Sequence, residues 1–218
     1  MIEGLGLQRS KNSLELSLDP IARQEADALI REAMQGVEQV AIIGLNPGAA
    51  YGPAKCWPAA KYARLAGHLI AKTGGLIIIF GTVADQQAAA EISAAAGERV
   101  LDLTGKTTLA QAQACIARCS VFVTNDSGLM HVAAALNTPL VAVFGSTDHI
   151  ATGPYSEQAT VVRQPVNCSP CMKTHCPKGH FQCMEGITVE KVEQATLEWL
   201  ENLTLQVRKN KRRRNYHE

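Results

Sequence analysis

The stretch that decides the fold reads VFVTNDSGLMHVAAAL over residues 121–136. Its first four residues form a short apolar run, and from residue 127 onward apolar side chains recur at helical spacing. Asp126 or Ser127 can cap that helix, because a side-chain oxygen at this position accepts a hydrogen bond from a first-turn N–H group. The stretch therefore predicts a buried strand that turns directly into a helix.

The same unit recurs along the chain. Short apolar runs alternate with Ala-rich amphipathic stretches, the runs at 40–45, 76–80, 99–103, 121–124 and 140–144 and the stretches at 58–73, 84–96, 108–119 and 127–136. Five strands joined by four crossover helices predict an α/β fold, an open Rossmann-like parallel sheet with helices on both faces. We also expect a linker at the amino terminus, a helix over 21–34 that ends at Gly36, a sixth strand over 160–163 and a closing helix over 188–203.

Composition favours a folded protein without a membrane span. Of 218 residues, 46% are hydrophobic and 19% are charged, which is enough to bury a core and excludes disorder of the whole chain. No apolar run approaches the roughly 18 residues of a membrane-spanning helix, and residues 1–4 open no secretory signal. We therefore expect a cytoplasmic location.

The charges are unevenly distributed. The formal net charge is +1, but six of the 21 basic residues lie close to the carboxyl terminus: Arg208, Lys209, Lys211, Arg212, Arg213 and Arg214. The remainder of the chain is acidic overall, which argues against a nucleic-acid-binding surface. The basic tail, 204–218, is either a solvated appendage or a peripheral contact with the anionic inner face of the cytoplasmic membrane.

A ligand of an open parallel sheet binds at the carboxyl ends of its strands. No G-x-G-x-x-G follows the first predicted strand, which excludes a dinucleotide-binding fingerprint. Gly105-Lys106-Thr107 resembles the end of a P-loop, but Val100 stands where that motif needs glycine. An NTPase is therefore not expected.

An anion site is the best interpretation of the loops after these strands. The free N–H groups of the helix that begins near Ser127 attract an anion, Gly128 lets it approach the backbone, and His131 lies one turn further on. Lys55, in the long loop after the first strand, supplies a cation. The alternatives are a capped helix with a packed histidine, and an ordinary surface lysine. Asp85 and Thr107 either bind a nucleoside or cap helices.

Four cysteines gather within sixteen residues: Cys168, Cys171, Cys176 and Cys183. Their C-x2-C-x4-C-x6-C spacing suits a structural tetrahedral Zn²⁺, which four thiolates bind well. Two disulfides or four free thiols are the alternatives, since such gaps are less diagnostic than paired C-x2-C units.

Three segments together resemble the bacterial heptosyltransferases of glycosyltransferase family nine. They are Asn46-Pro47-Gly48-Ala49 with Gly52-Pro53-Ala54-Lys55-Cys56-Trp57-Pro58, then Gly81 after an apolar run, then Thr124-Asn125-Asp126-Ser127-Gly128-Leu129-Met130-His131-Val132-Ala133-Ala134-Ala135. The similarity covers about residues 40–192. It implies a GT-B enzyme of two Rossmann-like halves, of which this chain supplies the donor-binding one.

The resemblance also implies a reaction. ADP-heptose would be the donor, the lipopolysaccharide inner core the acceptor, and transfer would invert the anomeric centre without a cofactor. Lys55, Asp126, Ser127, Gly128 and His131 match the positions that bind the donor diphosphate in the family.

The length of the chain departs from the family pattern. The resemblance implies an acceptor-binding half before the first strand, where this chain has 39 residues and no matching Asp or Glu, so no catalytic base is assigned. We interpret 1–36 as a linker and helix remaining from that half, 37–203 as the donor domain with a Cys-rich loop at 165–187, and 204–218 as the tail. A non-catalytic nucleotide-binding module and another GT-B sugar enzyme, such as an epimerase, are the alternative functions.

Overall fold

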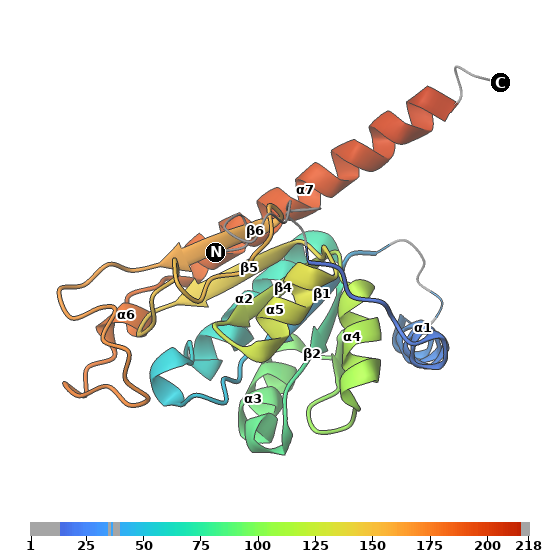
Figure 1. Ribbon diagram of the computed structural model, residues 1–218. Coiled ribbons are helices and arrows are strands. Elements are labelled where there is room, and N and C mark those ends of the chain that lie inside the picture. The colour runs from blue at the N-terminus through green and yellow to red at the C-terminus, as the bar shows by residue number, and fades with distance from the viewer. Residues whose placement is uncertain (1–13, 35, 37–39, 215–218) are drawn as a thin grey trace, which may run out of the picture.

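The computed structural model describes residues 14–34, 36 and 40–214, with side chains as far as residue 205. The strands within these residues form one six-stranded sheet in the order β3-β2-β1-β4-β5-β6, and every adjacent pair is parallel (Figure 1). The strands are β1 (Ile42–Asn46), β2 (Leu76–Ile79), β3 (Val100–Asp102), β4 (Val121–Asn125), β5 (Leu140–Phe144) and β6 (Ala159–Arg163). The expected open parallel sheet is confirmed. The first 13 residues of the predicted linker lie outside the described part of the chain.

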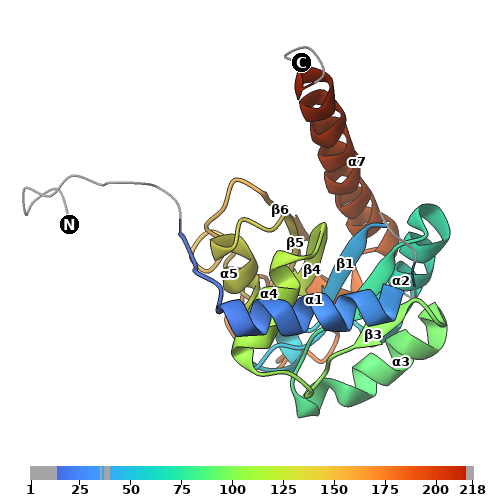
Figure 2. The ribbon, with the colours of Figure 1, turned by 90° about the vertical axis from the view of Figure 1, so that its right-hand side faces the viewer.

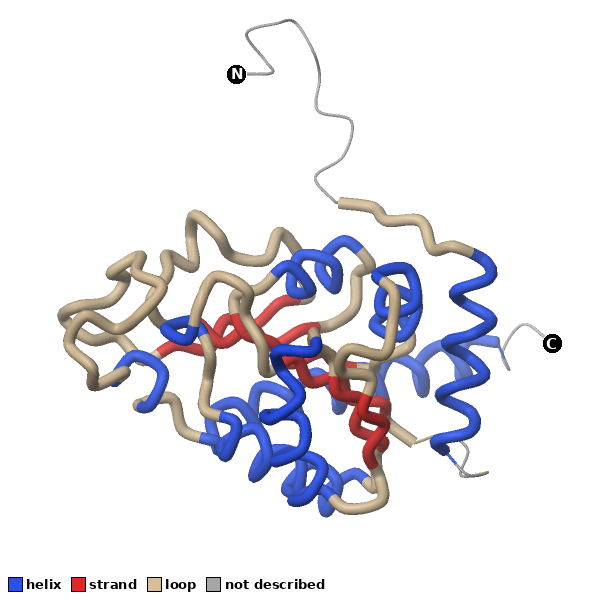
Figure 3. Tube along the Cα trace, turned by 90° about the horizontal axis from the view of Figure 1, so that it is seen from below, coloured by secondary structure: helices blue, strands red, loops and turns tan. Residues whose placement is uncertain are grey.

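Helices cover both faces of the sheet because its central strands are apolar on both sides. One face carries α1 (Pro20–Met34), α4 (Leu109–Ala117) and α5 (Gly128–Ala135), and α1 lies across it in Figure 2. The other face carries α2 (Ala59–Thr73), α3 (Gln86–Ala96) and the start of α7 (Val189–Arg214). In Figure 3 the strands accordingly run between helices on both sides.

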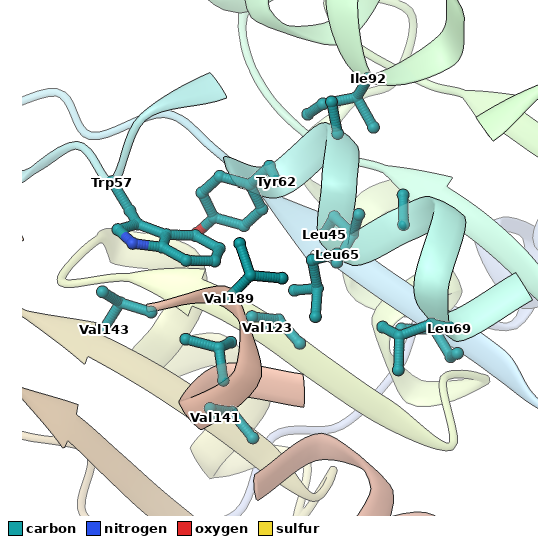
Figure 4. Close-up of a cluster of buried hydrophobic side chains, with 14 of the residues drawn as sticks. Leu45, Trp57, Tyr62, Leu65, Leu69, Ile92, Val123, Val141, Val143 and Val189 are labelled. Atoms are coloured by element: carbon teal, nitrogen blue, oxygen red, sulfur yellow. The ribbon is translucent and has the colours of Figure 1, made fainter. Parts of the chain in front are cut away.

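The core of the second face is built on the first turns of α2. Trp57 and Tyr62 are fully buried, with ring centroids 5.0 Å apart in an edge-to-face arrangement. Figure 4 shows them beside Val143 and Val189, with Leu65 and Leu69 continuing the cluster along α2. The Trp57 indole N–H donates to the carbonyl of Ile187, 3.0 Å away, so the large ring is buried with its polar atom satisfied.

Local sequence explains where several helices begin and where α1 ends. Asp19 Oδ1 accepts hydrogen bonds from the backbone N–H groups of Ile21 and Ala22, which caps α1. Gly36, just after that helix, has a φ of 81°, a conformation that favours glycine. At α4, Thr108 and Gln111 form a reciprocal capping box.

The structure differs from the sequence-based expectation at the carboxyl end. The closing helix was expected to stop at 203, but α7 continues to Arg214 through the basic segment and projects away from the sheet in Figure 1. Lys and Arg have high helix propensity, and cations are favoured near a helix carboxyl terminus. A helical turn α6 (Gln182–Glu185) and two 3₁₀ turns, η2 (Pro53–Lys55) and η3 (Val83–Asp85), were also not anticipated. None of the described helices has the length and apolar character needed to cross a membrane.

A buried carboxylate fixes α7 to α2. The Glu193 side chain is 7% exposed, forms an ion pair with Lys72, and lies 2.8 Å from Nδ1 of His68. The Lys72 hydrogen bond is the largest influence that lowers the pKa of Glu193 from its usual 4.5, and His68 lowers it further. A carboxyl group with a depressed pKa stabilises the fold above its unfolded pKa, and this contribution is lost as the pH falls through the folded value.

We expect Glu193→Gln to lower the free energy of unfolding by about 1–2 kcal/mol at pH 7, because it removes charge-assisted hydrogen bonds whose partners are largely exposed. The difference in the free energy of unfolding between this variant and the unsubstituted chain should shrink as the pH falls below the pKa of Glu193 in the unfolded chain. Urea denaturation at pH 7 and near pH 4 measures both quantities. Glu190→Gln, at an exposed position on the same helix, is the control and should change little. An equal loss at both pH values would show that packing, not charge, holds Glu193.

Candidate functional site

The loops that follow β1, β2 and β4 meet at the carboxyl edge of the sheet. The chain leaves β1 toward β2 on one side, whereas β4 pairs with β1 on its other side, so the strand order reverses between β1 and β4. Ligands of open α/β sheets bind at such a switch point. A cavity of about 580 Å³ opens there, and its lining includes Gly48, Asp85, Thr107, Ser127 and Gly128.

Lys55 and Asp126 form an ion pair at this edge, although they are 71 residues apart in sequence. The ammonium nitrogen of Lys55 lies 2.6 Å from Oδ2 of Asp126, and the two side chains are 11% and 5% exposed. The same carboxylate oxygen accepts hydrogen bonds from the hydroxyls of Thr147, at 2.6 Å, and Thr152, at 3.3 Å. Asp126 therefore holds the cation in place through this oxygen.

The ring of Tyr51 covers another side of the same ammonium. Lys55 Nζ lies 4.5 Å from its centroid, which is a cation–π distance. Tyr51 is held by the Cys-rich segment, since its hydroxyl donates to the Met172 carbonyl at 3.0 Å. The Ala54 N–H donates to the Thr174 carbonyl, also at 3.0 Å. The loop that presents Lys55 is thus braced by residues more than 100 positions later in the chain.

Asn125, at the end of β4, holds both ends of the Lys55 loop. Its side-chain oxygen accepts from the Trp57 N–H and the Tyr62 hydroxyl, both at 3.1 Å, and its nitrogen donates to the Pro47 carbonyl at 2.6 Å. The side chain is completely buried. Because β1 and β4 are adjacent in parallel register, the end of β4 lies beside the start of this loop.

The amino terminus of α5 does not have the cap that the sequence suggested. The Asp126 carboxylate is occupied by Lys55, and the Ser127 hydroxyl accepts from the Asn46 side chain at 2.8 Å and lies 3.1 Å from that of Thr124. No side chain of the described residues caps α5. Its first-turn N–H groups therefore have no side-chain partner at the positive end of the helix dipole, although the N–H of Met130 donates to the Ser127 carbonyl at 3.2 Å.

His131 is exposed on α5, one turn beyond Ser127. Neither His131 nor Lys55 lines the 580 Å³ cavity, whereas Ser127 and Gly128 do. The structure thus joins Lys55 directly to Asp126, and it places His131 on the helix that starts at this point.

Asp85 and Thr107 both line the cavity. Asp85 Oδ2 also accepts from the Thr82 N–H at 2.7 Å and the Thr82 hydroxyl at 2.9 Å, so it caps a turn as well. It packs so closely on Gly48 that a Cβ there would lie 2.3 Å from the carboxylate. The cap of the helix after Thr107 is its neighbour Thr108, so Thr107 has no capping role there.

The structure gives no support to the predicted zinc site. Cys168, Cys171, Cys176 and Cys183 line one small cavity of about 20 Å³ together with His180, but all are free thiols. Within the described residues, no three His, Cys, Asp or Glu side chains are grouped as metal ligands. The spacing therefore brings the four thiols to one cavity without forming a recognisable metal site among the described residues.

Two of these thiols have shifted pKa values for different reasons. Burial raises the pKa of Cys183, and the neighbouring Cys171 raises it further. The pKa of Cys176 is lowered, chiefly by a hydrogen bond from the backbone of Phe181. The segment therefore contains thiols of unequal acidity.

Several residues of the site were not identified from the sequence. Tyr51, Asn125, Thr147 and Thr152 each fix Lys55 or its loop, yet nothing in their spacing sets them apart from other polar loop residues. The only available signal was their position after β1, β4 and β5, where a ligand site was expected.

Comparison with known proteins identifies relatives along most of the chain. Residues 2–182 match the model of the family described as glycosyltransferase family 9 (heptosyltransferase). Lipopolysaccharide heptosyltransferase 2 of Escherichia coli K12 is 43% identical over 169 residues, which is 76% of this chain and 47% of that protein. The chain thus spans about half the length of the curated relatives that it matches.

Solved structures of heptosyltransferases and of a family 9 protein are similar to this chain. The ADP-heptose lps heptosyltransferase II of E. coli superposes with a TM-score of 0.73 and 34% identity, covering 87% of this chain and 54% of that one. A glycosyl transferase family 9 protein from Veillonella parvula gives a TM-score of 0.81 and 28% identity, with 92% and 58% covered.

Asn125→Ala should lower the free energy of unfolding by about 2–4 kcal/mol, because it leaves several buried polar groups without partners. The loss is measured by urea denaturation of the full chain. Asn202→Ala, at an exposed position on α7, is the matched control and should stay within about 0.5 kcal/mol of the unsubstituted chain. If both variants unfold alike, Asn125 does not hold the loop.

Proposed function

This chain belongs to glycosyltransferase family 9, the heptosyltransferases, and from that premise we propose that it binds ADP-heptose as the donor for heptose transfer to the lipopolysaccharide inner core. The observation that carries the proposal is the cation of Lys55, fixed by Asp126 beside the uncapped amino terminus of α5. A fixed cation and free helix N–H groups together suit a diphosphate.

Stabilisation of the leaving group is the chemical role of this arrangement. As the bond to the anomeric carbon breaks, negative charge develops on the departing nucleoside diphosphate. Lys55 and the N–H groups at Ser127 and Gly128 are the donors for that charge, and His131 adds an N–H donor. Loss of one preorganised donor typically costs about 3–4 kcal/mol of transition-state stabilisation.

Asp126 acts in this proposal through Lys55. Its carboxylate would repel a phosphate in direct contact, but it orients the ammonium and lowers the entropy lost when the cation meets the ligand. The large cavity beside Gly128 takes the nucleoside, with Asp85 as the acceptor for ribose hydroxyls and Thr107 beside the base.

The leaving diphosphate meets a lysine and a helix terminus, which can stabilise its charge without a metal ion. The structural zinc that the cysteine spacing suggested is a separate prediction, and metal analysis of the purified chain tests it.

We propose the donor-binding half of a GT-B enzyme, with residues 37–203 as the donor domain, and we assign no catalytic base. An inverting transfer needs a base for the acceptor hydroxyl, whereas the charged groups gathered at this edge serve the leaving group. We also propose that the protein is cytoplasmic and that the basic end of α7 lies near anionic lipid.

Parallel calorimetric titrations with ADP, UDP and GDP test the donor assignment, and we expect ADP to bind tightest. Lys55→Met should weaken ADP binding by about 10- to 100-fold, because a charge-assisted contact is typically worth about 1.5–3 kcal/mol. Lys72→Met is the matched control, since Lys72 also pairs with a buried carboxylate but lies on α2 against α7. The double variant Lys55→Met with Asp126→Asn avoids an unpaired buried charge and should keep the same loss. Unchanged affinity in it would reject Lys55 as a ligand.

We expect the 218-residue chain alone to bind ADP weakly and to transfer no heptose. General-base assistance is typically worth about 10²–10⁴-fold, and positioning of the acceptor adds to it. Incubation with ADP-heptose and a truncated lipopolysaccharide, followed by mass spectrometry of the acceptor, measures transfer. Robust transfer would contradict this expectation and would mean that a catalytic base lies among the residues present. Binding of ADP without transfer is the expected result, and a non-catalytic nucleotide-binding module would give the same result.

A further inference from the structure

Tyr51 is an aromatic residue of the Lys55 loop that the proposed leaving-group chemistry does not use. The ammonium of Lys55 lies over its ring, with 4.5 Å between Nζ and the ring centroid. Tyr51 is 46% exposed, so it contributes little to the buried core. The position of its ring is therefore set by specific contacts rather than by burial.

The Cys-rich segment, residues 165–187, supplies the contact that anchors this ring. The Tyr51 hydroxyl donates a hydrogen bond to the Met172 carbonyl at 3.0 Å. The Met172 N–H in turn donates to the carbonyl of Ser146, in the loop after β5, at 2.7 Å. The hydroxyl end of the ring is thus bound to a residue that is itself bound next to the end of a central strand.

Gly52, next to Tyr51, lets the loop approach the Cys-rich segment closely. Its φ of 145° is a conformation that favours glycine, and a Cβ there would lie 2.6 Å from the carbonyl oxygen of Thr174. The same carbonyl oxygen accepts a hydrogen bond from the Ala54 N–H at 3.0 Å. The turn that connects Tyr51 to Lys55 is therefore in contact with the segment at both of its ends.

The two partners of the Lys55 ammonium differ in charge. The Asp126 carboxylate, 2.6 Å away, is an anion, so it offsets part of the attraction between the ammonium and a phosphate. The Tyr51 ring is neutral and attracts the cation through the negative face of its π system, which leaves the charge of the ammonium in place. Both partners restrict a side chain with large rotamer entropy, so less freedom is lost when a ligand binds.

We propose that Tyr51 is a positioning residue for donor binding, and that its ring, anchored by the Cys-rich segment, holds the Lys55 ammonium in place for the diphosphate. The inference rests on the proposed function, because it needs a nucleoside diphosphate at Lys55. It gives the Cys-rich segment a role in ligand affinity that is exerted through the backbone carbonyls of Met172 and Thr174 rather than through its thiols.

Calorimetric titration of the full chain with ADP tests this role. In Tyr51→Leu we expect ADP to bind about three- to tenfold more weakly, because the cation loses its aromatic partner. Tyr51→Phe keeps the ring, and the Ala54 hydrogen bond still holds the loop, so its affinity for ADP should stay within about twofold of that of the unsubstituted chain. Tyr155→Leu is the matched control, since Tyr155 is 53% exposed in the loop after β5, and it should leave ADP binding unchanged.

A double-mutant cycle separates positioning of the cation from a general effect on the fold. In a chain that already carries Lys55→Met with Asp126→Asn, adding Tyr51→Leu should change ADP affinity by less than about twofold, because the ring has no cation left to position. Urea denaturation of Tyr51→Leu should give the same midpoint as the unsubstituted chain, since the side chain that it shortens is about half exposed.

The outcomes distinguish this inference from the proposed function. If Tyr51→Leu leaves ADP affinity unchanged, or if Tyr51→Phe loses as much affinity as Tyr51→Leu, the positioning role is wrong while the diphosphate site stands. An equal loss with and without Lys55 also overturns it, because the ring would then act on the ligand or on the fold directly. If the unsubstituted chain does not bind ADP, the proposed function fails and the positioning role fails with it. A loss that Tyr51→Phe rescues and that disappears without Lys55 supports the inference.

Discussion

The arrangement of the whole site depends on one buried ion pair, between Lys55 and Asp126. A buried carboxylate without a partner is costly, and here a single oxygen of Asp126 binds a lysine from the loop after β1 and two threonine hydroxyls from the loop after β5. The loops after β1, β4 and β5 are thereby fixed relative to one another. The ammonium of Lys55 has a fixed position at this edge because Thr147 and Thr152 hold its carboxylate partner.

Parallel register makes that ion pair possible. Because β1 and β4 are neighbours with Asn46 opposite Thr124, the loops that carry Lys55 and Asp126 leave the sheet at the same level. Asn125 then joins the ends of the Lys55 loop from the interior, and the Cys-rich segment braces it from outside through Thr174 and Met172. The site is thus a consequence of strand order, completed by side chains that are distant in sequence.

Sequence periodicity was sufficient for the fold, whereas the candidate site residues were predicted from their position after the strands and from the family resemblance. Each predicted strand lies within a few residues of an observed one, because continuous apolar runs are a strong signal of buried parallel strands. Lys55 and Asp126 were both predicted as site residues, but their ion pair was not, since spacing along a chain contains no information on contacts across a sheet. The predicted cap of α5 was wrong because Asn46 and Thr124 bind the Ser127 hydroxyl. For the four cysteines, short spacing in the sequence did predict that the thiols lie near one another, but it did not show whether they form a metal site, and no such site is found among the described residues.

The uncapped start of α5 has a thermodynamic consequence for the free protein. A helix that lacks an amino-terminal cap typically forgoes about 1 kcal/mol, and a bound anion satisfies the same N–H groups. Occupancy and folding are therefore linked, because any ligand that binds only the native state stabilises it by RT ln(1 + [L]/Kd). For this chain, any anion that bound the start of α5 in the native state alone would raise the free energy of unfolding as its concentration rose.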